Sequence, residues 1–336
     1  MRALLITFNY PQITEGYIDA EVALLRARGA QVLVWSQTPA PAPGVVPEGV
    51  EHAVAVPLDP LVARFKPDVI HVHWMLWEMN VLDFLARYGK PITVRVHTDT
   101  SSERLQHYAA HPAVSRIYGY PGDGERFNFA HPKFAERPIS VTRPAPQTVA
   151  KNPRLVLRAA SENPRDQTLM VALARRCPGL EFLLCIGESL HHDAQQTRPA
   201  LAAALGATPP PNLRIVWNQS PEIMAGWFAQ AAIYLHTCEP HQTAAMPISI
   251  GEALTHGCYT LVRNQPRLMA MVNAAGSVYS DEATAANLLL QTQSWSAADW
   301  AKKADQSRSA GEHFCADRAL QPMLDHWQQL IAQSYI

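Results

Sequence analysis

The stretch PISIGEALTHGCYTLV, residues 247–262, decides the fold of this chain. Pro247 suits the first position of a helix, because its fixed φ is helical and its missing N–H is not needed there. Three apolar residues then recur at the spacing of one buried helical face: Ile250, Ala253 and Leu254. Gly257 suits a left-handed residue that ends this helix, and the apolar run after it predicts a buried strand. The stretch therefore predicts a helix and a strand of an α/β protein.

Ser249 and Glu252 lie three residues apart in this helix, on a face that the apolar residues leave free. A phosphate group at the start of a helix meets free backbone amides and the positive end of the helix dipole. Glu252, one turn further along, can accept hydrogen bonds from the vicinal hydroxyls of a sugar. The pattern indicates a nucleotide-sugar pocket. The alternative is that Glu252 only compensates the helix dipole.

Apolar strands alternate with helical patterns in two successive blocks of the sequence. The predicted helices cover residues 18–28, 81–88, 167–176, 192–205 and 223–230. Strands separated by helices of this length predict parallel sheets with right-handed crossovers, so the fold class is α/β with two facing Rossmann-like domains. We expect a first domain over residues 1–145, a second over 146–312 and a last helical segment over 313–336.

Composition narrows the class of protein. The 336 residues are 48% hydrophobic and 17% charged, which is ordinary for a soluble enzyme, and the net charge of −1 argues against a dedicated nucleic-acid binder. No apolar run approaches the roughly 20 residues of a membrane span, and the apolar run at the start is too short for a signal peptide. Five cysteines without a CxxC pair predict buried, reduced thiols and a cytoplasmic location.

Histidines follow two of the predicted strands. His71 and His73 alternate with Val72, so both side chains point to one face of the sheet, as in a metal pair. No cysteine or carboxylate stands at ligand spacing beside them, so we predict no metal site. His97 and Asp99 follow the next strand.

Residues 248–258, ISIGEALTHGC, resemble the donor-site helix of glycosyltransferase family 4, and the likeness extends over nearly the whole chain. The resemblance implies the GT-B fold and a retaining transfer of a sugar from a nucleoside-diphosphate sugar to a glycan or lipid-linked acceptor. It implies an N-terminal acceptor-binding domain over residues 1–145, a nucleotide-sugar-binding domain over 146–312 and a C-terminal helix, over 313–336, that packs back on the first domain. It implies no metal requirement and no cofactor beyond the donor substrate. Polysaccharide biosynthesis is the usual setting of this family.

The same resemblance assigns roles to single residues. The donor side would comprise Arg158 at the end of a strand, Arg165 before the next helix, Ser249, Glu252 and the first loop's Glu15 and Gly16. His97 would orient the sugar or the acceptor, with Asp99 beside it, and the acceptor side would include His73 and Trp74. For each of them a structural role, such as capping a helix or packing in the core, is the alternative.

The sequence departs from the family's pattern in two places. The family has a lysine some five residues after the first cation, whereas Arg165 follows Arg158 by seven. The family's other glutamate, eight residues before Glu252, is replaced by Ala244, and Glu239 is the candidate substitute. A catalytically degenerate GT-B binding subunit and a sugar-nucleotide epimerase therefore stay open as alternatives.

An oxidoreductase is disfavoured, because no GxGxxG follows the first strand. The expected partners are a nucleotide sugar and a saccharide acceptor, without nucleic acid. Peripheral contact with a membrane, the nucleotide base, the sugar, the linkage and the oligomeric state are left open by the sequence.

Overall fold

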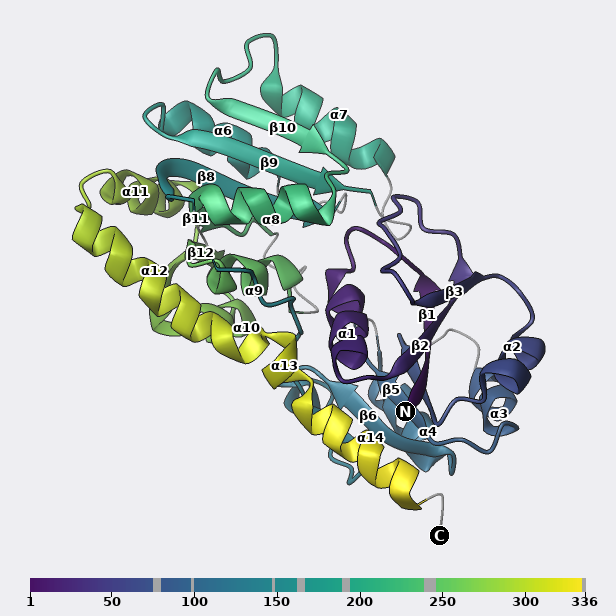
Figure 1. Ribbon diagram of the computed structural model, residues 1–336. Coiled ribbons are helices and arrows are strands. Elements are labelled where there is room, and N and C mark those ends of the chain that lie inside the picture. The colour runs from purple at the N-terminus through teal and green to yellow at the C-terminus, as the bar shows by residue number, and fades with distance from the viewer. Residues whose placement is uncertain are drawn as a thin grey trace. The chain divides into compact units, whose positions relative to one another are not determined.

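The computed structural model describes residues 1–74, 80–97, 100–146, 149–161, 167–188, 194–238 and 246–333 (Figure 1). Its contacts divide the chain into two units. The first comprises Met1–Pro11, Tyr17–Ser140 and Ala316–Ile336, and the second comprises Gln12–Gly16 and Val141–Cys315. The boundaries expected from the sequence, after residues 145 and 312, do not anticipate that residues 12–16 belong to the second unit.

The first unit is built on one parallel sheet. Its strands are β1 (Arg2–Asn9), β2 (Gln31–Thr38), β3 (Glu51–Val54), β4 (Val69–His73), β5 (Ile92–Arg95), β6 (Val114–Gly119) and β7 (Phe134–Glu136). Its helices are α1 (Gly16–Ala27), α2 (Leu58–Phe65), α3 (Asn80–Ala86), α4 (Ser102–Ala110), α5 (Asp123–Arg126), α13 (Ala316–Ala319) and α14 (Gln321–Gln333). The strand order is β3-β2-β1-β4-β5-β6-β7, so it reverses between β1 and β4. Ligands of such sheets bind at the carboxyl ends of the strands beside this reversal.

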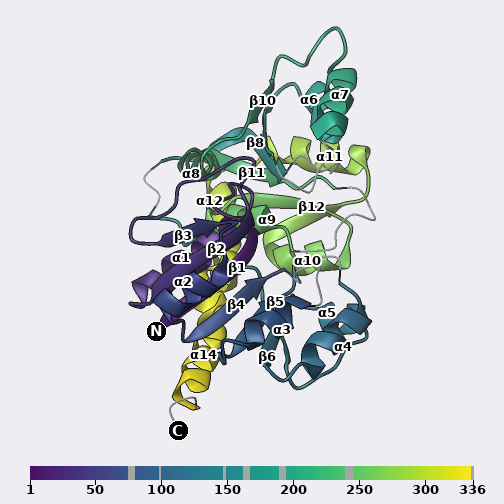
Figure 2. The ribbon, with the colours of Figure 1, turned by 90° about the vertical axis from the view of Figure 1, so that its right-hand side faces the viewer.

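Both faces of the first sheet are covered by helices. Successive side chains of a strand point to opposite faces, and β1 accordingly sends Leu4 and Ile6 into a core with α2, α3 and α4. Ala3 and Leu5 enter a second core, which α1, α13 and α14 complete. Trp327 of α14 is fully buried in this second core. Figure 2 shows α14 on the opposite side of the sheet from α3 and α4.

The second unit repeats this architecture. Its strands are β8 (Asn152–Ser161), β9 (Glu181–Gly187), β10 (Leu213–Trp217), β11 (Ala231–Leu235), β12 (Tyr259–Arg263) and β13 (Gly276–Tyr279). Its helices are α6 (Thr168–Arg176), α7 (Ala194–Leu205), α8 (Pro221–Gln230), α9 (Ile248–Thr255), α10 (Pro266–Val272), α11 (Glu282–Thr292) and α12 (Ala297–Gly311), with short 3-10 turns η1 (Asn273–Ala275) and η2 (Glu312–Phe314). The order β10-β9-β8-β11-β12-β13 reverses between β8 and β11. The predicted α/β class with two parallel sheets is confirmed.

The stretch at residues 247–262 forms α9 and β12. The prediction was wrong by one position at its start, because Pro247 precedes the helix as its N-cap. Gly257 has a φ of +76°, and its N–H donates to the carbonyl of Leu254 at 2.9 Å. The next N–H, of Cys258, donates to the carbonyl of Ala253 at 2.8 Å. This pair of bonds closes the helix with a left-handed glycine, as predicted.

Three further predictions, on the last helical segment, the cysteines and membrane-spanning helices, can be compared with the structure. The closing helical segment is divided into η2, α13 and α14, and Pro322 stands in the first turn of α14, where a missing N–H is tolerated. All five cysteines are buried and none forms a disulfide. Among the described residues, no helix combines the length and the apolar character needed to cross a bilayer.

Candidate functional site

Polar side chains gather at the carboxyl end of the second sheet, where β8 and β11 lie side by side at the reversal of strand order. Arg158 comes from β8, Tyr234 from β11, and Thr237 from the turn that follows β11. Ser249 and Glu252 come from the first two turns of α9. Open α/β sheets bind their ligands at this edge, so these five side chains form the candidate site of the second unit.

Arg158 is completely buried, and its guanidinium is hydrogen-bonded to neighbouring residues of the protein. Its Nε donates to Thr237 Oγ1 at 3.0 Å and its Nη2 to the Thr237 carbonyl at 2.9 Å. Its Nη1 donates to the Tyr234 hydroxyl at 2.8 Å and to the carbonyl of Ala159. The prediction that Arg158 ends its strand was wrong, because β8 continues to Ser161. These bonds hold the guanidinium inside the second unit against Ala159, Tyr234 and Thr237.

A chain of hydrogen bonds leads from Arg158 to the start of α9. The Tyr234 hydroxyl accepts from Arg158, and its single proton has two acceptors in range, Ser249 Oγ at 2.6 Å and the Ala159 carbonyl at 3.2 Å, of which Ser249 is the closer. Burial raises the pKa of Tyr234, so this hydroxyl keeps its proton and stays a donor. Successive bonds of this kind polarise one another in a buried setting. The positive charge of Arg158 thus reinforces the positive end of the α9 dipole at Ser249.

Glu252 lies one turn further along α9. Within the described part of the chain, no hydrogen bond or ion pair reaches its carboxylate, and burial raises its pKa to about 7. Gly16 lies beside it. A Cβ on Gly16 would be 3.9 Å from Glu252 Oε1 and 3.5 Å from Ile248 Cδ1, although the φ of Gly16 is an ordinary one. These are ordinary van der Waals distances, so neither a close contact nor a left-handed backbone explains the glycine at this position.

The first loop, residues 12–16, is held against the second sheet. The Gln12 side-chain amide donates to the carbonyl of Glu188, just after β9, at 2.6 Å. Glu15 is buried in the same loop, with its N–H bonded to the carbonyl of Gln12 at 2.9 Å. The structure thus brings Gly16 to Glu252 and sets Glu15 in the same unit. Arg165, Glu239, Ala244 and Asp99 lie outside the described residues.

The raised pKa of Glu252 predicts a pH-dependent stability. A carboxyl group whose pKa rises from 4.5 to about 7 on folding stabilises the fold below pH 4.5, and this contribution is lost as the pH rises through 7. Between pH 5 and pH 8, we expect the unfolding free energy of wild type to fall by up to about 3 kcal/mol more than that of Glu252→Gln. Urea denaturation at both pH values measures this. The exposed Glu181→Gln serves as the control, and a constant difference for Glu252→Gln would contradict the prediction.

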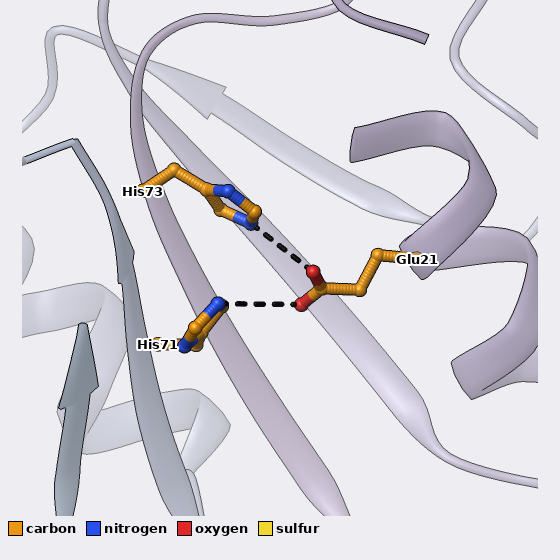
Figure 3. A group of neighbouring side chains, drawn as sticks. All are labelled: Glu21, His71 and His73. Atoms are coloured by element: carbon orange, nitrogen blue, oxygen red, sulfur yellow. Dashed lines mark ion pairs between the residues drawn. The ribbon is translucent and has the colours of Figure 1, made fainter. Parts of the chain in front are cut away.

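The first unit has a polar cluster at its own reversal of strand order (Figure 3). His71 and His73 of β4 both point toward Glu21 of α1, which confirms that they share one face of the sheet. His71 Nε2 is 3.7 Å from Glu21 Oε1, and His73 Nε2 is 3.5 Å from Glu21 Oε2. All three residues are at most 3% exposed. Burial lowers the pKa of His71 to about 3, so its ring is neutral.

His97 lies just beyond β5 and next to His73. Its Nε2 is 3.1 Å from His73 Nδ1, and its Nδ1 is 2.9 Å from the Tyr120 hydroxyl. Burial lowers the pKa of His97 well below the usual range, so this ring is neutral as well. The ring of Trp74, a partly buried residue with a φ of +69°, stands 4.7 Å from the His97 ring. The structure thus brings together His73, Trp74 and His97. Both ring nitrogens of His97 are hydrogen-bonded within the protein, one to His73 and one to Tyr120.

Sequence reasoning missed Glu21, because it sought a carboxylate close to the histidines along the chain. The available signal was its position in α1: Ile18, Val22 and Leu25 form the buried face of the helix, and Glu21 stands on that face. A carboxylate on a core-facing stripe requires a polar partner. Tyr234 and Thr237 were missed because their role depends on the hydrogen bonds of Arg158.

The second unit also has a cavity of about 570 Å³, lined by Lys151, Ala232 and Trp300 among others. Lys151 precedes β8 and Ala232 stands near the start of β11, so the cavity lies at the amino ends of these strands. That is the edge opposite the one where open α/β sheets bind ligands. The cavity is therefore separate from the candidate site.

No protein-family model and no curated protein matches this sequence. Solved structures do match it over nearly its full length. HepE from Anabaena, in complex with UDP and glucose, is 15% identical, with 97% of this chain and 99% of that chain covered and a TM-score of 0.70. A glycosyltransferase from Rickettsia africae is 12% identical over 98% of both chains, with a TM-score of 0.72. Sucrose-phosphate synthase from Thermosynechococcus elongatus is 13% identical, covering 99% and 100%, with a TM-score of 0.77.

The chain has the GT-B fold. At 12–15% identity, the likeness to these glycosyltransferases is one of architecture. Membership of glycosyltransferase family 4 stays a prediction from the residues at 248–258.

Proposed function

We propose that this protein is a glycosyltransferase that takes its sugar from a nucleoside-diphosphate sugar. The observation that carries this proposal is the chain from buried Arg158 through Tyr234 to Ser249 at the start of α9. It directs positive charge to a helix N-terminus, where phosphate groups bind readily. The GT-B fold, seen also in HepE with UDP and glucose bound, supports the same choice.

In this proposal the second unit binds the donor. Ser249 and the first amides of α9 bind the diphosphate, and Glu252 accepts hydrogen bonds from the ribose hydroxyls. Gly16 lets the backbone approach the donor closely, with Glu15 beside it. Arg165 and Glu239, both outside the described residues, are proposed as a second cation for the diphosphate and as the carboxylate that contacts the donor sugar.

Charge develops on the departing diphosphate during transfer. Preorganised donors aimed at such charge are a major source of rate enhancement, and Arg158 supplies this charge through Tyr234 and Ser249. We propose a retaining transfer in which the acceptor attacks from the side of the leaving group and the diphosphate takes the acceptor's proton. This path requires no carboxylate nucleophile and no metal ion at the diphosphate.

For the first unit we propose the acceptor role. Trp74, which is partly exposed, would contact the saccharide, and the preceding residue, the buried His73, would hold it in place. His97 would orient the sugar or the acceptor by exchanging its bond to Tyr120 for one to a sugar hydroxyl, and Asp99 would assist it. A glycan or lipid-linked saccharide is the acceptor that the family resemblance implies.

A panel of nucleotide sugars, tested with and without saccharide acceptors, separates the alternatives. We expect one nucleoside diphosphate to raise the melting temperature and its sugar conjugate to release that diphosphate faster when an acceptor is present. Isomerised nucleotide sugar without an acceptor would instead identify an epimerase. Stabilisation without turnover on any acceptor would identify a binding subunit, and no stabilisation by any nucleotide would refute the donor site itself.

A further inference from the structure

The cluster of Glu21, His71 and His73 has no part in donor binding, and its polar atoms converge on one point (Figure 3). One ligand atom from each residue can be chosen so that all three lie within 4.8 Å of one another. Within the described residues, Glu21 Oε1 and the Nε2 atoms of His71 and His73 have no hydrogen-bond partner. Buried polar atoms are nearly always satisfied in native proteins. Three unsatisfied atoms at one place therefore call for a ligand between them.

The distances fit a metal ion at that point. Bonds of 2.0–2.1 Å in a tetrahedral site separate neighbouring ligand atoms by about 3.4 Å. Glu21 Oε1 lies 3.7 Å from His71 Nε2, and the other carboxylate oxygen, Oε2, lies 3.5 Å from His73 Nε2. Both separations are too long for a hydrogen bond. They exceed the tetrahedral value by only a few tenths of an ångström.

The surrounding residues orient the two imidazoles as metal ligands are usually oriented. A ligating histidine commonly donates its other ring N–H to a neighbouring acceptor, which fixes the tautomer. His71 Nδ1 lies 2.8 Å from Thr93 Oγ1, and His73 Nδ1 lies 3.1 Å from His97 Nε2. His97 can accept that proton because its own Nδ1 bonds to the Tyr120 hydroxyl. One set of tautomers thus leaves both Nε2 lone pairs directed at Glu21.

We propose that Glu21, His71 and His73 bind one divalent transition-metal ion, of the Zn²⁺ class, inside the first unit. Two imidazoles and one carboxylate suit zinc and its neighbours, whereas Mg²⁺ and Ca²⁺ prefer oxygen ligands alone. The ion joins α1 to β4, whose residues are far apart in the sequence. This proposal departs from the sequence-based expectation of no metal site. It rests on the geometry of these three residues and not on the proposed transfer reaction, although His73 also has a proposed place on the acceptor side.

Direct titration of the full chain tests the proposal. The protein is stripped with a chelator, dialysed and titrated with Co²⁺, which gives visible absorption when bound in a tetrahedral or five-coordinate site. We expect one Co²⁺ per chain, displacement of that absorption by Zn²⁺, and a higher melting temperature with Zn²⁺ but not with Mg²⁺. A wild-type protein that shows neither the absorption nor the stabilisation would overturn the proposal.

Matched variants locate the site. Glu21→Gln and His73→Phe keep the approximate size of the side chains. Loss of a residue that only hydrogen-bonds a metal ligand weakens metal binding by roughly 10- to 100-fold. We expect loss of a ligand itself, in either variant, to weaken Co²⁺ binding by at least as much. His111→Gln is the control, because His111 pairs with Asp83 at 3.2 Å elsewhere in the same unit. Far-UV circular dichroism of the metal-free variants checks their folding. Equal binding by wild type, Glu21→Gln and His73→Phe would place the ion elsewhere and refute the assignment.

Discussion

Replacing Arg158 with methionine is expected to weaken nucleoside diphosphate binding by about 10- to 100-fold. Hydrogen bonds to charged groups contribute roughly 1.5–3 kcal/mol each, and about 1.4 kcal/mol corresponds to a factor of ten. Methionine fills much of the same volume but removes the charge that reaches Ser249 through Tyr234. Isothermal titration calorimetry with UDP, GDP and ADP measures the loss for whichever of them binds wild type.

Two further variants separate the charge from general damage to the fold. Tyr234→Phe keeps the arginine but breaks the hydrogen-bond chain, so we expect a smaller loss of affinity in the same direction. Arg154→Met changes an exposed arginine on the same strand, whose Nε bonds to the Gly179 carbonyl, and should leave affinity unchanged. Wild-type affinity in a folded Arg158→Met protein would remove Arg158 from the donor site.

Replacing Trp327 with alanine is expected to lower the unfolding free energy of the first unit by about 3–5 kcal/mol. Trp327 is fully buried among Leu5, Ile18 and other residues of the core beneath α14, and truncating a buried aromatic side chain loses its transfer free energy and leaves a cavity. Urea denaturation followed by circular dichroism measures the change. Gln328→Ala, an exposed neighbour on the same helix, should change it by less than about 0.5 kcal/mol.

A small effect at Trp327 would mean that α14 contributes little to the first unit. The sequence showed an apolar stripe in this helix, which fits packing against any partner. Its packing on the first domain was expected from the family resemblance, and the contacts identify the core that it shares with β1 and α1.

Local signals in the sequence were sufficient for the fold. Alternating apolar runs and helical patterns predicted two parallel sheets, because each run is a strand buried on both faces. Gly257 predicted the end of α9 correctly, since its left-handed conformation is dictated by one residue. Elements without a strong apolar period, such as α4 and β7, gave no comparable signal.

The candidate sites were less accessible to sequence reasoning, because their geometry depends on residues distant along the chain. Arg158 was predicted to be a cation of the donor site, but nothing in the sequence indicated its complete burial or its bonds to Tyr234 on β11 and Thr237 in the turn after it. Glu21 meets His71 and His73 only because β1 and β4 are neighbours in the sheet while α1 crosses beside them. The spacing of residues along the sequence does not reveal contacts between residues that are so far apart in it.

The most direct test of the donor site is a crystal structure of the protein with the nucleoside diphosphate that it binds, soaked at millimolar concentration. We expect the two phosphate groups within hydrogen-bond distance of Ser249 Oγ and the first amides of α9, with the ribose hydroxyls at the Glu252 carboxylate. A diphosphate bound elsewhere on the chain, or an empty α9 N-terminus at saturating ligand, would contradict the account.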